Sequence, residues 1–150
     1  MINISQRDKQ WGSHKIGKSD LTIADFGCTL TSICMLADYF GEYHNPIDMQ
    51  QFQDFTPEGL IIWESLKLKK MKFGKRLRTV DHKEIQISLK DPKKACLLEM
   101  QLPSGKHWVV ATSKIPFVDA YGIVDPWDAK KKTTYAYKNQ IVGSAHFYSL

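Results

Sequence analysis

The hydrophobic periodicity of the chain changes once, after Lys94, and this change limits the possible folds more than any other feature of the sequence. Before Lys94 the apolar residues recur mainly at helical spacing. After it they gather in short runs, rich in β-branched and aromatic residues, at 95–102, 106–112, 121–125, 133–137 and 145–149. Such runs predict the strands of an antiparallel meander. Helices followed by strands indicate an α+β fold with the helices packed on one face of the sheet.

The first half of the chain predicts four helical segments. The clearest begins at Cys28, because the apolar positions 30, 33, 34, 37 and 40 share one helix face and Gly41 follows as a C-cap. Two more are expected at 46–52 and 56–69, the latter with inward-facing Leu60, Trp63 and Leu66. The fourth is expected to start at Asp81, because Asp81 and Glu84 have capping-box spacing. Residues 5–27 are expected to form an ordered loop anchored by Trp11.

A basic run from Lys67 to Arg78 holds seven lysines and arginines and no acid. We interpret it as the solvated end of the helix at 56–69, where lysines interact favourably with the helix dipole, rather than as a phosphate-binding patch.

Size and composition predict a single domain, 1–150, because 150 residues with 43% hydrophobic content suffice for one core. The three cysteines cannot form a closed disulfide framework, and no Cys-x-x-Cys pair suggests a zinc site. The first residues do not resemble a signal peptide, and no apolar run approaches the length of a membrane span. We therefore expect a cytoplasmic protein, with export by another route, such as a phage particle, left open.

Cys28 occupies the position where a reactive thiol is most useful. It follows Gly27 and starts a helix, so its sulfur would lie at the positive end of the helix dipole, which stabilises a thiolate. A buried structural cysteine is the alternative, and that interpretation fits Cys34 and Cys96 better because apolar residues surround them.

His107 and Asp125 are candidates for the partners of this thiol. His107 opens the apolar run at 108–111, and Asp125 closes the next run before Pro126. If these two strands are antiparallel neighbours, the imidazole and the carboxylate meet. The carboxylate would then orient the ring so that its other nitrogen takes a proton from the thiol. The alternatives are an ordinary strand histidine and an Asp-Pro turn.

Four segments occur in an order that resembles the bacteriocin-processing peptidase-like family, papain-like cysteine peptidases similar to the double-glycine leader peptidases. They are QRDKQW at 6–11, TIADFGCTLTS at 22–32, KHWVV at 106–110 and VDPW at 124–127. The resemblance spans most of the chain, whereas residues 42–94 match only loosely. It implies a papain-like fold in which the nucleophile helix packs on a C-terminal antiparallel sheet.

The resemblance also implies a role for each matching residue. Cys28 would be the nucleophile, His107 the general base and acid, and Asp125 the orienting carboxylate. Gln6 would join the backbone N–H of Cys28 in the oxyanion hole. Gly27, Trp108 and Trp127 would lie at the substrate, with Trp127 shielding the histidine–aspartate pair. For Trp11 and Trp127, the alternative to covering the site is simple packing in the core. No metal or organic cofactor is required.

The substrate implied by the resemblance is a peptide or a peptide-like polymer such as peptidoglycan. The leader-processing members belong to membrane exporters, and this sequence shows no membrane segment, so a double-glycine substrate is not implied. Two other functions remain open: a catalytically silent structural or binding module, for example in a phage, and an acyl transferase of transglutaminase-like type. Nucleic-acid binding by the basic run ranks last, and the oligomeric state is not predicted.

Overall fold

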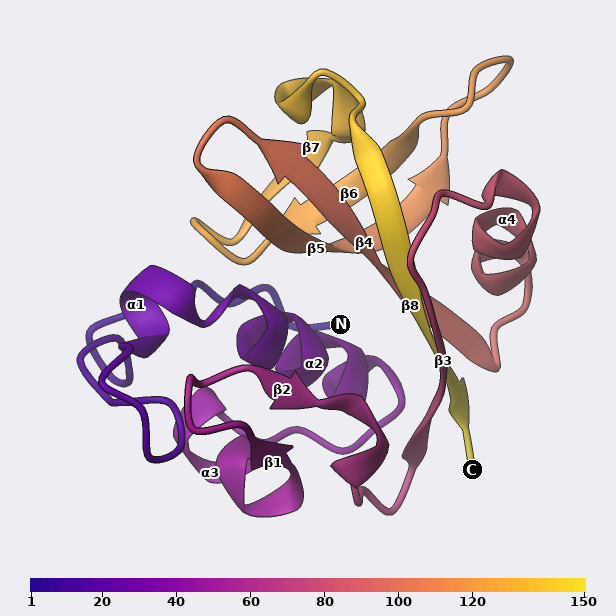
Figure 1. Cartoon of the computed structure of the whole chain (residues 1–150). Helices are drawn as coiled ribbons and strands as arrows, with labels where there is room; N and C mark the ends of the chain where they lie inside the picture. Colours follow the sequence, from indigo (N-terminus) through magenta and orange to yellow (C-terminus); the bar gives the residue numbers. More distant parts are fainter.

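A six-stranded antiparallel sheet packs against helix α2 (Cys28–Tyr39) in the computed structural model, which describes all 150 residues (Figure 1). The order of the strands across the sheet is β3-β8-β4-β5-β6-β7. Their bounds are β3 Met71–Leu77, β4 Lys94–Leu102, β5 Gly105–Lys114, β6 Tyr121–Asp125, β7 Lys130–Thr133 and β8 Ile141–Ser149. The fold is therefore α+β with an antiparallel sheet, as the change in periodicity predicted.

Helix α2 lies at the centre of the molecule, between the sheet and the N-terminal segments (Figure 1). Every residue from Leu30 to Ala37 is buried, so apolar contacts surround the helix on all sides. The largest core cluster joins this helix to side chains of one face of the sheet, among them Leu97, Val110 and Phe147. This packing fixes the start of α2 relative to strands β4 and β5.

The opposite face of the sheet carries a second core, which corrects the expectation that all helices pack on one face. Helix α4 (His82–Lys90) contributes Ile85 to this cluster, together with Leu98 and Val109 from the sheet. Leu97 and Leu98 thus serve different cores, because neighbouring residues of a strand point to opposite faces.

Most elements expected from the sequence are present. Helix α2 ends before Gly41, the segment at 46–52 is α3 (Pro46–Met49) followed by η1 (Gln50–Phe52), and Asp81 caps α4 by accepting the Glu84 N–H at 3.1 Å. The N-terminal loop folds in an ordered way and includes one short helix, α1 (Ile23–Phe26). None of the helices combines the length and the hydrophobicity that crossing a membrane requires.

The helix expected at 56–69 is absent. Thr56 instead closes a turn: its N–H donates to the Leu60 carbonyl at 2.8 Å, and its hydroxyl accepts the Leu60 N–H at 3.1 Å. Gly59 adopts a left-handed φ of +84°, which a helix does not permit. The turn joins β1 (Asp54–Phe55) to β2 (Ile61–Ile62), and η2 (Trp63–Ser65) follows. Leu60, expected to face inward, is 65% exposed.

The basic run was also wrongly assigned, because its second half is strand β3 rather than a helix end. Strand β3 pairs with β8 at the edge of the sheet, where lysines are well tolerated. The strand expected at 133–137 is shifted: β7 ends at Thr133, and η3 (Thr134–Tyr137) follows. The meander itself covers only β4 to β7, since β8 returns to lie between β3 and β4.

Two leucine substitutions test this packing. Leu97→Ala should lower the free energy of unfolding by about 2–5 kcal/mol, because it opens a cavity under α2. Leu60→Ala should change it by less than about 0.5 kcal/mol. Urea denaturation of both variants measures the difference, and comparable losses would contradict the hairpin turn at 56–60.

Candidate active site

Cys28 is the first residue of α2, and it can occupy this position because the residue before it is a glycine, Gly27. A Cβ atom on residue 27 would lie 2.5 Å from the Ile23 carbonyl oxygen, so only glycine fits the tight junction between α1 and α2. The Cys28 side chain is partly exposed and lies at the N-terminus of a 12-residue helix. The helix dipole therefore favours its thiolate form.

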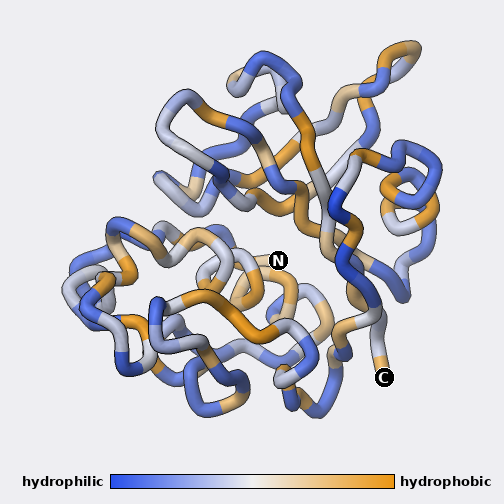
Figure 2. The backbone as a smooth tube through the Cα atoms, viewed as in Figure 1, coloured by the Kyte–Doolittle hydropathy of each residue, from blue (hydrophilic) through white to orange (hydrophobic).

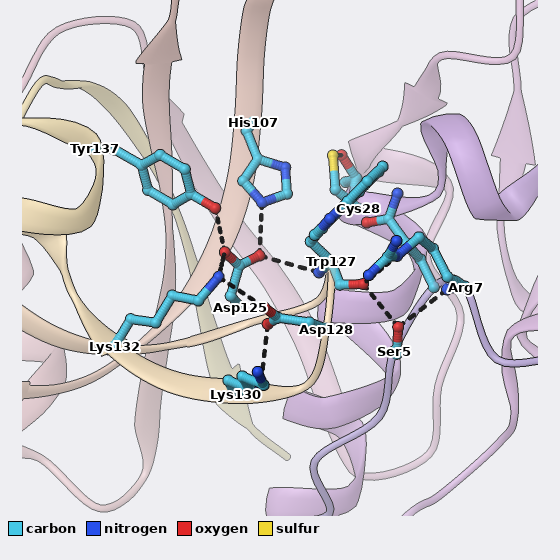
Figure 3. Close-up of polar contacts among 12 residues, drawn as sticks. Ser5, Arg7, Cys28, His107, Asp125, Trp127, Asp128, Lys130, Lys132 and Tyr137 are labelled. Carbon is cyan, nitrogen blue, oxygen red and sulfur yellow. Dashed lines mark hydrogen bonds and ion pairs between the residues drawn. The ribbon is translucent and has the colours of Figure 1, made fainter.

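His107 and Asp125 meet as expected. The register of β5 and β6 places Val110 opposite Val124, so Asp125 lies diagonally across from His107 on the same face of the sheet. His107 Nε2 donates to Asp125 Oδ1 at 2.7 Å, and both side chains are buried. Figure 3 shows the ring between Asp125 and Cys28, with its second nitrogen on the side of the thiol.

The thiol and the imidazole shift the pKa values of each other. Burial raises the pKa of Cys28, but the hydrogen bond and positive charge of His107 outweigh it, with help from the Trp108 N–H and the Thr29 hydroxyl, and the pKa is lowered. Burial lowers the pKa of His107, but its hydrogen bonds to Asp125 and Cys28 raise it to about 9. Each shift favours the charged form of its group, the thiolate of Cys28 and the imidazolium of His107.

Asp125 is held by donors on both carboxylate oxygens. Oδ1 accepts the Trp127 N–H at 3.0 Å as well as His107, and Oδ2 accepts Lys132 Nζ at 2.8 Å and the Tyr137 hydroxyl. Burial raises the pKa of Asp125, but these donors outweigh it and hold the pKa well below its usual range. The carboxylate is therefore charged throughout the pH range in which His107 titrates.

Sequence reasoning missed Lys132 and Tyr137. Lys132 lies opposite Ile123 in the register of β6 and β7, which places it on the face that carries Asp125. Tyr137 belongs to η3 and also packs its ring edge-on against His107, with centroids 5.5 Å apart. Nothing distinguishes Lys132 within its run of lysines, so only the strand register identifies it.

Gln6 lies inside the molecule close to the start of α2. Its backbone N–H donates to the Pro126 carbonyl at 2.7 Å, which ties the N-terminal loop to the end of β6. Its side-chain Nε2 donates to the Ala24 carbonyl at 2.9 Å, while Oε1 is buried without a partner. The loop therefore folds back toward the start of α2, but no hydrogen bond joins Gln6 to Cys28 directly.

The tryptophans differ in their surroundings. Trp11 packs in the main core and donates to the Ser5 carbonyl at 2.8 Å. Trp127 is 39% exposed, and the Arg7 guanidinium lies 4.3 Å from the centre of its ring. The backbone N–H of Trp127, rather than its ring, contacts Asp125. Trp108 is buried and lines a cavity of about 360 Å³ that also borders Thr29, the residue after Cys28.

The other cysteines have different environments from Cys28. Cys34 and Cys96 are fully buried, and burial raises the pKa of both thiols, that of Cys96 to about 12. They are core residues, as expected. The remaining buried histidine, His146, contacts the hydroxyls of Ser88 and Ser144 and no carboxylate. No cluster of three His, Cys, Asp or Glu side chains has the arrangement of a metal site.

No protein-family model matches this chain, and a search of curated proteins finds no match. The interpretation of the site therefore depends on its geometry and on the motifs within the sequence.

Replacing the orienting carboxylate tests the electrostatics of the site. Asp125→Asn should lower the pKa of His107 by about one unit or more, because it removes the negative charge that favours the imidazolium. Asp128→Asn is the matched control, since Asp128 contacts Lys132 but not His107. NMR titration of the imidazole protons measures both variants. An unchanged His107 pKa in Asp125→Asn would contradict the assigned coupling.

Proposed function

We propose that the protein is a thiol-dependent hydrolase of papain-like type, which cleaves a peptide or amide bond through Cys28, His107 and Asp125. The observation that carries the proposal is the geometry of one site: the His107 ring lies between Cys28, at the start of α2, and the buried Asp125 carboxylate, 2.7 Å from its Nε2 (Figure 3). A structural cysteine gains nothing from such a partner. A nucleophile gains reactivity at neutral pH.

The motif order supports the same proposal. Each segment of the family resemblance contributes one part of the site: Gln6, then Cys28, then His107, then Asp125. These residues come from the N-terminal loop, helix α2 and two neighbouring strands. The papain-like fold and the bacteriocin-processing peptidase-like family are part of this proposal.

The proposed reaction has two stages. The Cys28 thiolate attacks the substrate carbonyl carbon, and the oxyanion that forms accepts hydrogen bonds from two donors. One donor is the Cys28 N–H, which has no intrahelical acceptor because it lies in the first turn of α2. The other is the second amide hydrogen of Gln6 Nε2, beyond the one bound to Ala24.

Proton transfers through His107 complete the cycle. The imidazolium donates its proton to the leaving amine as the carbon–nitrogen bond breaks, which leaves an acyl group on Cys28. His107 then removes a proton from water, which attacks the thioester and releases the acid. Asp125 keeps the ring oriented in both stages through the 2.7 Å bond to Nε2.

Alkylation at low pH tests the nucleophile. Sub-stoichiometric iodoacetamide at about pH 6, where an ordinary thiol is almost fully protonated, should label Cys28 in preference to Cys34 and Cys96. His107→Ala should abolish this labelling of Cys28, because it removes the positive charge that stabilises the thiolate. Peptide mapping by mass spectrometry locates the label. Equal labelling of all three thiols, or none on Cys28, would favour a silent binding module.

Turnover is tested with peptide libraries and purified peptidoglycan, with Cys28→Ala as the control. For any substrate found, Gln6→Ala should lower kcat by about 100- to 1,000-fold, because one oxyanion donor is lost. The alkylation rate of Cys28 should change little, since that reaction forms no oxyanion. A parallel loss of both would assign Gln6 a structural role. Release of amine without free acid, when an added amine is present, would indicate acyl transfer instead of hydrolysis.

A further inference from the structure

We propose that the substrate of the Cys28 site is delivered as an extended acidic segment that adds as a short strand to the open edge of β3. The inference rests on the proposed hydrolase function and names the class of its substrate. Four features of the surface between β3 and the start of α2 support it: a free strand edge, two adjoining hollows that we call the groove, an excess of positive charge and apolar side chains close to Thr29.

Strand β3 is the outermost strand of the sheet and pairs only with β8 (Figure 1). Its outer backbone groups therefore have no strand partner, which is the arrangement that extended peptides use when they add to a sheet. A bulge lies between Phe73 and Lys75, so regular pairing is available from Lys75 onwards. Leu77 lies opposite Ser144, which in turn lies opposite Leu98 of β4. The strand thus runs toward the end of β4 that pairs with His107.

Two hollows form one groove along this edge. The first is the cavity of about 360 Å³ beside Thr29 and Trp108. The second, of about 450 Å³, is lined by the consecutive residues 72–76 of β3. Consecutive residues of a strand point to opposite faces, so a hollow that touches all of them follows the backbone edge. Arg76 and Arg78 line both hollows, so the two hollows adjoin at these side chains.

The charge along the groove is positive. Lys75 and Arg76 are balanced by Glu84 at 2.9 Å and Glu99 at 3.1 Å, whereas Lys72 and Arg78 have no ion-pair partner. The four cations that line the two hollows outnumber the acids that line them, Glu64 and Glu99. Figure 2 shows a largely hydrophilic backbone trace along β3. These cations oppose pairing of the edge with the same edge of another copy and favour an acidic strand.

The hollow next to Thr29 is lined mainly by apolar residues, with Arg76, Arg78 and Glu99 as its charged members. Leu60, Ile61, Trp63 and Trp108 line the first cavity. The backbone trace is hydrophobic along β2, which contains Ile61 (Figure 2). Arg76 lies over the Trp108 ring at 4.8 Å and keeps a buried Nε without an acceptor. A substrate carbonyl or carboxylate group can satisfy this donor. The groove therefore fits an acidic strand that places an apolar side chain next to the nucleophile.

Binding to the full-length Cys28→Ala variant tests the groove independently of turnover. The probes are fluorescein-labelled peptides of roughly eight residues that alternate glutamate with valine, or lysine with valine. Fluorescence anisotropy should show at least about tenfold tighter binding of the acidic peptide. Lys72→Glu and Arg78→Glu should each weaken it at least about tenfold, whereas Lys90→Glu, on the exposed end of α4, should have no effect. Equal affinity for the two peptides, or insensitivity to both groove variants, would overturn the proposal.

N-methylated peptides test strand addition itself. Only alternate amides of an added strand pair with the edge, so methylation of either the glutamate or the valine amides should weaken binding at least about tenfold more than methylation of the other set. Equal effects would refute strand addition. Tighter binding of a single-stranded oligonucleotide than of the acidic peptide would make the groove a nucleic-acid site and refute the proposal. Since the thiol is absent from the binding variant, a failure of alkylation at Cys28 in the wild type is a separate result.

Discussion

The buried negative charge of Asp125 is the constraint on which the rest of the site depends. A carboxylate that is fully buried is stable only if several hydrogen-bond donors surround it, and four donors bind Asp125. Lys132 and Tyr137 donate hydrogen bonds to one carboxylate oxygen, and His107 donates to the other. The ring is thereby fixed in orientation and kept basic, and its second nitrogen faces the thiol.

The position of Cys28 depends on steric fit instead of charge. Gly27 is the only residue that fits the junction between α1 and α2, and this junction places Cys28 at the positive end of a buried helix. The helix cannot shift without disturbing the core that it shares with the sheet. Thiol and imidazole are thus positioned by two rigid elements, which is the arrangement that nucleophilic catalysis requires.

The parts of this structure that follow local rules could be predicted from the sequence. The period of α2 and its flanking glycines located Cys28, and adjacent antiparallel strands brought His107 to Asp125. The prediction failed where the same residues satisfy two local structures. The segment Thr56-Pro57-Glu58 is compatible with the start of a helix and with a turn, and the positive φ of Gly59 favours the turn.

Other failures have a tertiary origin. Strand β3 has few β-forming residues, and it exists because β8 offers it a pairing edge. Lys132 and Tyr137 became site residues through the register of β7 and the position of η3, which no periodicity encodes. The family resemblance pointed to Cys28, His107 and Asp125, but Lys132 and Tyr137, which donate to Asp125, were visible only in the fold.

The account as a whole rests on the electrostatic coupling of the Cys28 thiol to the His107 imidazole, and the pH dependence of thiolate absorbance measures it most directly. The ultraviolet difference between wild type and Cys28→Ala should show a thiolate well below the pKa of about 8.5 that free cysteine has. In His107→Ala this thiolate should appear only at higher pH. A Cys28 thiolate that forms only above about pH 8.5 in the wild type would contradict the account.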